Sequence, residues 1–117
     1  EAARLSISKE ISPTTVSENA RLTYTFRIRN FGNAAATEAD NAVISDTFDP
    51  RLSDLTVTYN GTPWTAGTDY VYDATTGIFT SIAGRVTVGA ATFTTDPVSG
   101  AVTVTPGIGT LIVSGIV

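Results

Sequence analysis

The chain of 117 residues contains no cysteine and no histidine. Without cysteine, neither a disulfide framework nor a thiolate metal site can form. Without histidine, the commonest general base and the commonest metal ligand are both missing, which excludes the usual serine hydrolase triad and most other catalytic arrangements. We therefore expect no metal, no cofactor and no conventional enzyme activity.

Basic residues are also scarce, with seven lysines and arginines against 11 acidic residues and a net charge of −4. This balance argues against nucleic acid as a partner, because phosphate binding needs a basic face. The nearest approach to a basic patch, Arg21, Arg27 and Arg29, alternates along one predicted strand and indicates a solvated face. No apolar run is long enough to span a membrane, so we expect no membrane insertion.

The residues that are abundant, Thr, Ser, Val, Ala and Gly, suit an exposed β-protein of the bacterial surface type, and we expect an extracellular location on a cell or spore. No signal peptide follows Glu1, which indicates a mature product or an excised fragment. The length predicts one domain over residues 1–117.

Short alternating segments separated by turn residues predict an all-β chain folded as an immunoglobulin-like sandwich. The clearest strand is "ARLTYTFRIRN", and Asn60-Gly61 predicts a hairpin turn. Only one helical turn is expected, near residues 34–39. The predicted strands lie within residues 4–12, 20–30, 42–48, 54–61, 67–81, 84–107 and 109–117.

The only lysine in the chain occupies an unexpected position. In "RLSISKEIS", Lys9 alternates in register with Leu5, Ile7 and Ile11, on the apolar face of a predicted strand. In "AVISDTF", Asp46 shares its face with apolar neighbours in the same way. An unpaired charge in a core is costly, so we predict that Lys9 and Asp46 lie inside the sandwich and close together.

Two interpretations of this pair are open. The first is a buried salt bridge, or a pair at the edge of the core that reaches solvent. The second is chemical, because a lysine held in an apolar core can lose its proton and become a nucleophile. A buried, protonated aspartic acid can polarise a carbonyl group. The two side chains would then need only a side-chain amide to form an isopeptide bond with loss of ammonia.

The stretches "SKEISPTTVSENARLTYTFRIRNFGN" and "AVISDTFDPRLSDLTVTYNG" resemble the conserved repeat domain of Gram-positive surface proteins known as domain of unknown function eleven. The layout is also similar to the collagen-adhesin type of isopeptide domain, and the likeness covers nearly the whole chain. The resemblance implies an immunoglobulin-like stalk or fibre module. It further implies that Lys9 is the cross-linking residue, joined to an asparagine, and that Asp46 is the catalytic acid.

One element of the family pattern is missing. The family's last strand carries an Asn-x-Ala motif, whereas this chain ends in "GTLIVSGIV" with no asparagine after Asn60. The other asparagines occupy turn or loop positions: Asn19, Asn30, Asn33 and Asn41. We therefore expect a sandwich that lacks its closing strand. The predicted function is a structural subunit of a surface fibre that accepts an asparagine-bearing strand from a copy of itself or a related subunit, through single-turnover isopeptide formation at most.

Other residues suggest different functions. The acidic stretch around Asp40, Asp46 and Asp49 suggests calcium, but it lacks the spacing of an EF-hand loop. Four aromatic residues could form a sugar-stacking platform, although core packing is the more usual role: Tyr59, Trp64, Tyr70 and Tyr72. The alternative functions are a passive stalk or spacer repeat of an adhesin, and an adhesin module for an unidentified host or surface ligand.

Overall fold

The computed structural model describes residues 3–12 and 19–117. Its strands are β1 (Leu5–Ser12), β2 (Arg21–Asn30), β3 (Ser45–Thr47), β4 (Ser53–Tyr59), β5 (Thr62–Pro63), β6 (Tyr70–Asp73), β7 (Ile78–Ser81), β8 (Thr92–Thr95), β9 (Val102–Thr105) and β10 (Gly107–Ile116). A single 3-10 turn, η1, covers Glu38–Asp40, at the end of the segment where one helical turn was expected. None of the described residues belongs to a helix that is long and apolar enough to cross a membrane.

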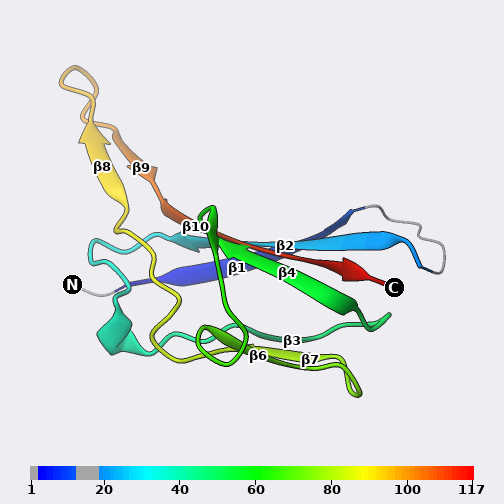
Figure 1. Cartoon of the computed structure of the whole chain (residues 1–117). Coiled ribbons are helices and arrows are strands. Elements are labelled where there is room, and N and C mark those ends of the chain that lie inside the picture. Colours follow the sequence, from blue (N-terminus) through cyan, green and yellow to red (C-terminus); the bar gives the residue numbers. More distant parts are fainter. Residues whose placement is uncertain (1–2, 13–18) are drawn as a thin grey trace.

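The strands form two facing layers (Figure 1). The larger sheet has the order β1-β2-β10-β4-β5 and the smaller has the order β3-β7-β6. Every pair of named strands is antiparallel. The chain is therefore an all-β, sandwich-like protein, as the sequence predicted. The strands β8 and β9 form a separate hairpin that projects away from both layers, and all their residues are exposed.

The centre of the larger sheet follows directly from the alternation in β2. Four side chains of this strand are buried against the smaller sheet: Leu22, Tyr24, Phe26 and Ile28. The neighbouring β10 buries Leu111 and Val113 on the same face. On the opposite face, Arg27 forms an ion pair with Glu10 of β1 across the strand boundary. The arginines thus lie on the outer face as predicted, with Arg21 exposed and with Arg27 and Arg29 half-buried.

Turn residues shape the strand connections as the sequence indicated. Asn60 and Gly61 both have positive φ angles, 51° and 82°, which is the geometry of a tight hairpin between β4 and β5. At the β6–β7 turn, the Asp73 carboxylate accepts a hydrogen bond from the Thr75 amide at 2.8 Å. The strand expected over residues 42–48 is shorter than predicted, because the Ile44 amide donates to the Ser81 hydroxyl rather than to a backbone carbonyl.

Aromatic rings fill the space between the layers. Phe48 stacks on Tyr24 with ring centres 4.5 Å apart and also lies 5.7 Å from Phe79 and 5.8 Å from Tyr72. Tyr70 in turn stacks on Phe79 at 5.2 Å. Because Phe48 follows β3 directly, this cluster fixes the distance between β3 and the larger sheet.

The aromatic residues considered as a sugar platform are divided between two places. Tyr59 is buried, stacks with Trp64 at 5.3 Å and donates its hydroxyl to the Thr87 carbonyl at 2.6 Å. Tyr72 belongs to the other cluster and donates its hydroxyl to the Leu52 carbonyl at 2.7 Å. These rings pack within the fold, which is the more usual role of such aromatic residues.

Asn30 has a different role from the plain turn role expected from the sequence. Its side chain is fully buried; the oxygen accepts hydrogen bonds from the amides of Arg4 and Gly32, both at 2.9 Å. Its nitrogen donates to the carbonyls of Ala34 at 2.8 Å and Gly89 at 3.1 Å. One amide group therefore joins the start of β1 to the segment that leads into the β8–β9 hairpin. The period-two alternation of β2 extends to Asn30 and places it on the inner face, whereas its exposed neighbour Asn33 lies beyond the strand.

Replacing Asn30 with Ala should lower the free energy of unfolding by about 2–4 kcal/mol, because several buried backbone groups lose their only side-chain partner. Asn33→Ala, in the same turn but exposed, is the matched control and should change stability by less than about 0.5 kcal/mol. Urea denaturation of both variants measures the difference. Equal effects would show that the Asn30 network contributes nothing specific.

Stability should also fall at high pH. Burial raises the pKa of Tyr24, Tyr59 and Tyr70 above the ordinary value of 10.0. The unfolded chain therefore loses these protons first, so the stabilising contribution is complete below pH 10.0 and is lost as pH rises through the higher folded-state values. Denaturation midpoints measured between neutral and strongly alkaline pH should decline from about pH 10 onward. A flat profile through that range would contradict the assigned burial.

Candidate functional site

The two sheets leave one side of the sandwich open, between β1 and β3. Among the described strands, β1 is the outermost of the larger sheet and pairs with β2 alone, while β3 is the outermost of the smaller sheet and pairs with β7 alone. We call this open side the seam, formed by β1 and residues 42–47. In the part of the chain that the structure describes, no strand pairs with either of these two free edges.

Hydrogen bonds to the neighbouring strands show which backbone groups of β1 and β3 point into the seam. The Phe31 amide donates to the Arg4 carbonyl at 2.8 Å, so the even-numbered residues of β1 bond to β2. The backbone N–H and C=O groups of the odd-numbered residues, including Ile7 and Lys9, therefore point into the seam. On the other side, the Ser81 amide donates to the Ile44 carbonyl at 2.8 Å, which by the same rule leaves the backbone groups of Ser45 facing outward.

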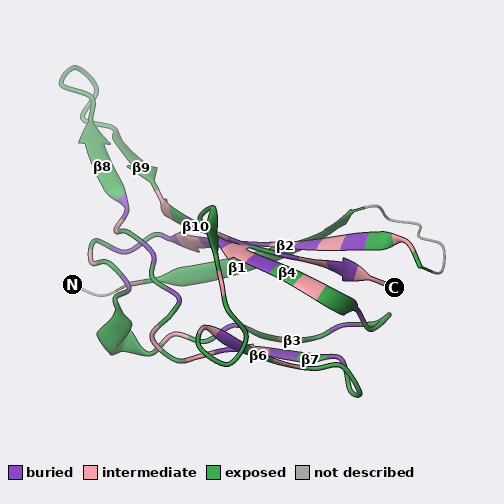
Figure 2. Ribbon diagram, in the orientation of Figure 1, coloured by how far each residue is buried: buried purple, intermediate pink, exposed green. Residues whose placement is uncertain are grey.

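The apolar side chains of β1 are more exposed than the sequence predicted. Leu5, Ile7 and Ile11 are 43%, 54% and 39% exposed, and every residue of the strand is classed as exposed (Figure 2). The expected half-buried strand is wrong in this respect. The alternation does place these residues on the inner face, but no described part of the chain covers them at the open seam.

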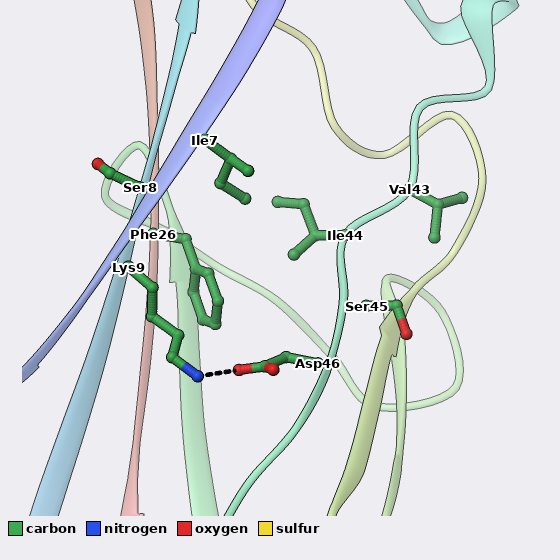
Figure 3. Close-up of a pocket in the computed structure, with 8 residues that line it drawn as sticks. All are labelled: Ile7, Ser8, Lys9, Phe26, Val43, Ile44, Ser45 and Asp46. Atoms are coloured by element: carbon green, nitrogen blue, oxygen red, sulfur yellow. Dashed lines mark hydrogen bonds and ion pairs between the residues drawn. The ribbon is translucent and has the colours of Figure 1, made fainter.

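Two cavities adjoin each other along the seam. The larger, of about 310 Å³, lies beside Lys9 and Asp46 (Figure 3); its lining is Ile7, Ser8, Lys9, Phe26, Val43, Ile44, Ser45 and Asp46. The smaller, of about 140 Å³, lies toward the start of β1 and is lined by Leu5, Ser6, Ile7, Ile28, Ala42, Val43, Ile44 and Val86. The two cavities share Ile7, so they are successive spaces along the same strand. No asparagine lines either of them.

Lys9 and Asp46 meet across the seam, as the sequence predicted. The Lys9 ammonium donates to the Asp46 carboxylate with an Nζ–Oδ2 distance of 2.7 Å (Figure 3). Their side chains are 38% and 24% exposed, so the expectation that both lie inside the sandwich is corrected. The pair faces the interior, but no described part of the chain covers it, so water reaches it. In this open state the contact is the solvent-reaching pair at the edge of the core.

Tyr24 completes the surroundings of the pair. Its ring centre lies 5.2 Å from the Lys9 ammonium, within the range of a cation–π contact. Burial, followed by the charge of Asp46, raises the pKa of Tyr24 and keeps its hydroxyl neutral. The sequence placed Tyr24 on the inner face, but it gave no sign of this contact. The contact follows from the pairing of β1 with β2. Lys9 pairs with Phe26 and Ile11 pairs with Tyr24, so Tyr24 lies diagonally next to Lys9.

The acidic residues considered for calcium take separate roles. Asp40 accepts a hydrogen bond from the Thr37 amide at 2.7 Å, whereas Asp46 binds Lys9. Within residues 3–12 and 19–117, no three acidic residues are grouped so that they could hold a metal ion. Asn60 accepts a hydrogen bond from the Thr110 amide at 2.8 Å, and Asn19 and Asn41 have positive φ angles, as their turn positions led us to expect.

Comparison with known proteins found no family model, no curated protein and no solved structure that matches this chain.

Breaking the ion pair in the isolated chain should have only a small effect on stability. Lys9→Met and Asp46→Asn should each lower the free energy of unfolding by about 1 kcal/mol or less, because solvent-exposed ion pairs contribute little. Chemical denaturation measures the change, and Arg27→Met, which breaks the outer-face pair with Glu10, serves as a control of similar exposure. A loss of several kcal/mol at Asp46 would show that the seam is closed in solution.

Proposed function

We propose that this chain is a structural module of a bacterial surface fibre that accepts a β-strand from a neighbouring subunit at the seam. We further propose that an asparagine in that strand becomes cross-linked to Lys9. The observation that carries the proposal is the free edge of β1, whose backbone groups lie next to the Lys9–Asp46 pair and pair with no described strand. The resemblance to isopeptide domains of Gram-positive surface proteins supports the same assignment of Lys9 and Asp46.

Two features of the seam favour strand acceptance: its free backbone edge and its exposed apolar side chains. A long free edge is a template for pairing with another chain, and natural proteins usually blunt or cover such edges. Here β1 offers a row of backbone donors and acceptors, and Leu5, Ile7 and Val43 expose apolar side chains beside it. An incoming strand would satisfy the hydrogen bonds and remove these apolar groups from water, which are the two sources of affinity in strand addition.

Strand addition also changes the chemistry of the ion pair. Once a strand covers Lys9 and Asp46, water no longer stabilises their separate charges, and transfer of one proton across the Nζ–Oδ2 contact gives a neutral amine and a neutral acid. The amine is then a nucleophile, and the acid can donate a hydrogen bond to a carbonyl oxygen. Both groups line the same cavity, where a side-chain amide could lie.

The reaction balances with an asparagine as the third group. The neutral Lys9 Nζ attacks the side-chain carbonyl carbon of the incoming asparagine, and Asp46 stabilises the oxygen on which negative charge develops. Asp46 then transfers a proton from the attacking nitrogen to the leaving nitrogen. The carbon–nitrogen bond of the asparagine amide breaks, ammonia leaves, and a new amide joins the two chains. Each site reacts once, so the chain is not an enzyme in the ordinary sense.

Strand donation of this kind joins unlike surfaces of successive subunits. Such a heterologous contact generates an open filament rather than a closed dimer. Covalent closure of each joint would make the filament resistant to unfolding and dissociation, which suits an extracellular fibre.

The second candidate is a passive spacer repeat in a surface stalk. It is favoured by the solvent access of Lys9 and Asp46, which need no chemical role to explain a surface ion pair.

The test uses the chain and a synthetic peptide that carries an asparagine in a strand of alternating Thr and Val residues. We expect a product that survives boiling in detergent and has the summed mass less one ammonia. Lys9→Arg keeps the charge but should give no product, and Asp46→Ala should slow the reaction by at least about 100-fold, the usual scale of general acid–base catalysis.

Because Lys9 is the only lysine, the chain offers a matched control. The double variant Lys9→Arg with Arg29→Lys has the same composition but places the amine on the outer face of β2, and it should give no product. Absence of ammonia loss in the wild-type chain with saturating peptide would exclude the cross-link. If the peptide does not bind at all, the strand-acceptor function is wrong and the spacer interpretation remains.

A further inference from the structure

The β8–β9 hairpin projects from the sandwich, and every residue from Thr92 to Thr105 is exposed (Figure 2). We call residues 92–105 the finger. It leaves the sandwich after the buried Ala91 and returns to β10 through Pro106. Among the described strands, β8 and β9 pair with each other alone, so the outer edges of the finger are free. Free strand edges invite pairing with other chains, and natural proteins often protect them with charged residues.

The finger lacks this protection. Asp96 is its only charged residue, and the Asp96 carboxylate accepts a hydrogen bond from the Val98 amide at 2.8 Å within the turn. The finger is instead rich in hydroxyl groups, which belong to six of its 14 residues: Thr92, Thr94, Thr95, Ser99, Thr103 and Thr105. Pro97 lies within the finger and Pro106 directly follows it. Segments that combine serine and threonine with proline are typical acceptors of O-linked sugars.

The strand register gathers four of these hydroxyl groups on one face of the finger. Thr92 pairs with Thr105, and Thr94 pairs with Thr103. Side chains two residues apart in a strand point the same way, so the four threonines form one surface, which we call the threonine face. Neighbours across the strands lie about 5 Å apart, and successive residues on one face lie about 7 Å apart. The opposite face carries exposed apolar side chains: Phe93, Val102 and Val104.

We propose that the threonine face is a site of O-glycosylation, at which threonine hydroxyl groups carry hexose or hexosamine units. The reaction uses a nucleotide-activated sugar and a glycosyltransferase of the producing organism. The Oγ1 atom of a threonine attacks the anomeric carbon of the sugar, the bond from that carbon to the phosphate oxygen breaks, and the nucleoside diphosphate leaves. The hydroxyl proton passes to a base of the transferase. No residue of the seam takes part, so this inference goes beyond the proposed function and does not depend on it.

The position of the finger favours such a modification. Because the finger stands clear of both layers, a transferase can approach the threonine face without contacting the sandwich (Figure 1). Attached sugars are bulky and solubilising, and on this face they would flank the free edges of β8 and β9. They would thereby hinder edge-to-edge pairing and offset the scarcity of charged residues. One modification thus accounts for both the hydroxyl groups and the unprotected edges.

A second occurrence of the same tripeptide provides an internal control. The sequence Thr103-Val104-Thr105 of the finger is repeated at residues 56–58 of β4. There, however, the strand lies between β10 and β5, and the side chain of Val57 is buried in the core. A transferase cannot enclose this tripeptide as it can enclose the finger. We therefore expect sugars on the finger and none on residues 56–58.

The experiment uses the protein isolated from the organism that produces it, beside the same chain made in a host that has no O-glycosyltransferase. Mass spectrometry of the peptide that contains residues 92–105 should show whole hexose or hexosamine units in the native protein alone. Electron-transfer fragmentation should place them on the threonine face, and mild alkaline β-elimination should remove them. A native peptide with the mass of the polypeptide alone would overturn the proposal, as would mass steps of phosphate.

Variants expressed in the producing organism then test the site. Replacing the four residues of the threonine face with valine should abolish the added mass, whereas the control T56V/T58V should leave it unchanged. Both variants should keep the urea midpoint of the unmodified chain within a small margin, because exposed substitutions change stability little. Four single Thr→Val variants give the share of each residue if the fourfold variant aggregates. Equal modification of residues 56–58, or sugars that persist in the fourfold variant, would contradict the assignment.

Discussion

The free edge of β1 is the constraint on which the rest of the site depends. Its inner pairing with β2 is complete over eight residues, whereas no described residue pairs with its outer edge. This single gap explains why the apolar side chains of β1 are exposed, why two cavities lie beside them, and why the Lys9–Asp46 pair reaches solvent. A sheet edge of this length is normally covered, and covering it would change all three features together.

The ion pair shows how strongly the chemistry of two side chains depends on what surrounds them. In the open seam, water and the Tyr24 ring stabilise the Lys9 charge, and the contact with Asp46 is a weak surface interaction. Under a covering strand, the same two atoms would exchange one proton and become a nucleophile and an acid. In the proposed assembly, the pair would remain inactive until the partner strand covers it.

Positioning of the pair depends on parts of the chain outside the seam. The stack of Tyr24, Phe48 and Phe79 holds the two layers together directly behind β3, and thereby sets the reach from Asp46 to Lys9. At the other end, the buried amide of Asn30 anchors the start of β1. The seam is therefore open because no described strand covers it, and not because the frame around it is loose.

Sequence alone determined most of the strands, the inner faces and the identity of the pair. Period-two alternation indicated the inner face of β2 and placed Lys9 and Asp46 on inner faces, because side-chain direction in a strand depends only on local geometry. Burial, in contrast, depends on which strands lie side by side, and only the tertiary structure showed that β10 pairs with β2 and leaves β1 uncovered. The same holds for Asn30, whose partners are up to 59 residues away in the sequence. Alternation determines where a side chain points, but long-range strand pairing determines what, if anything, covers it.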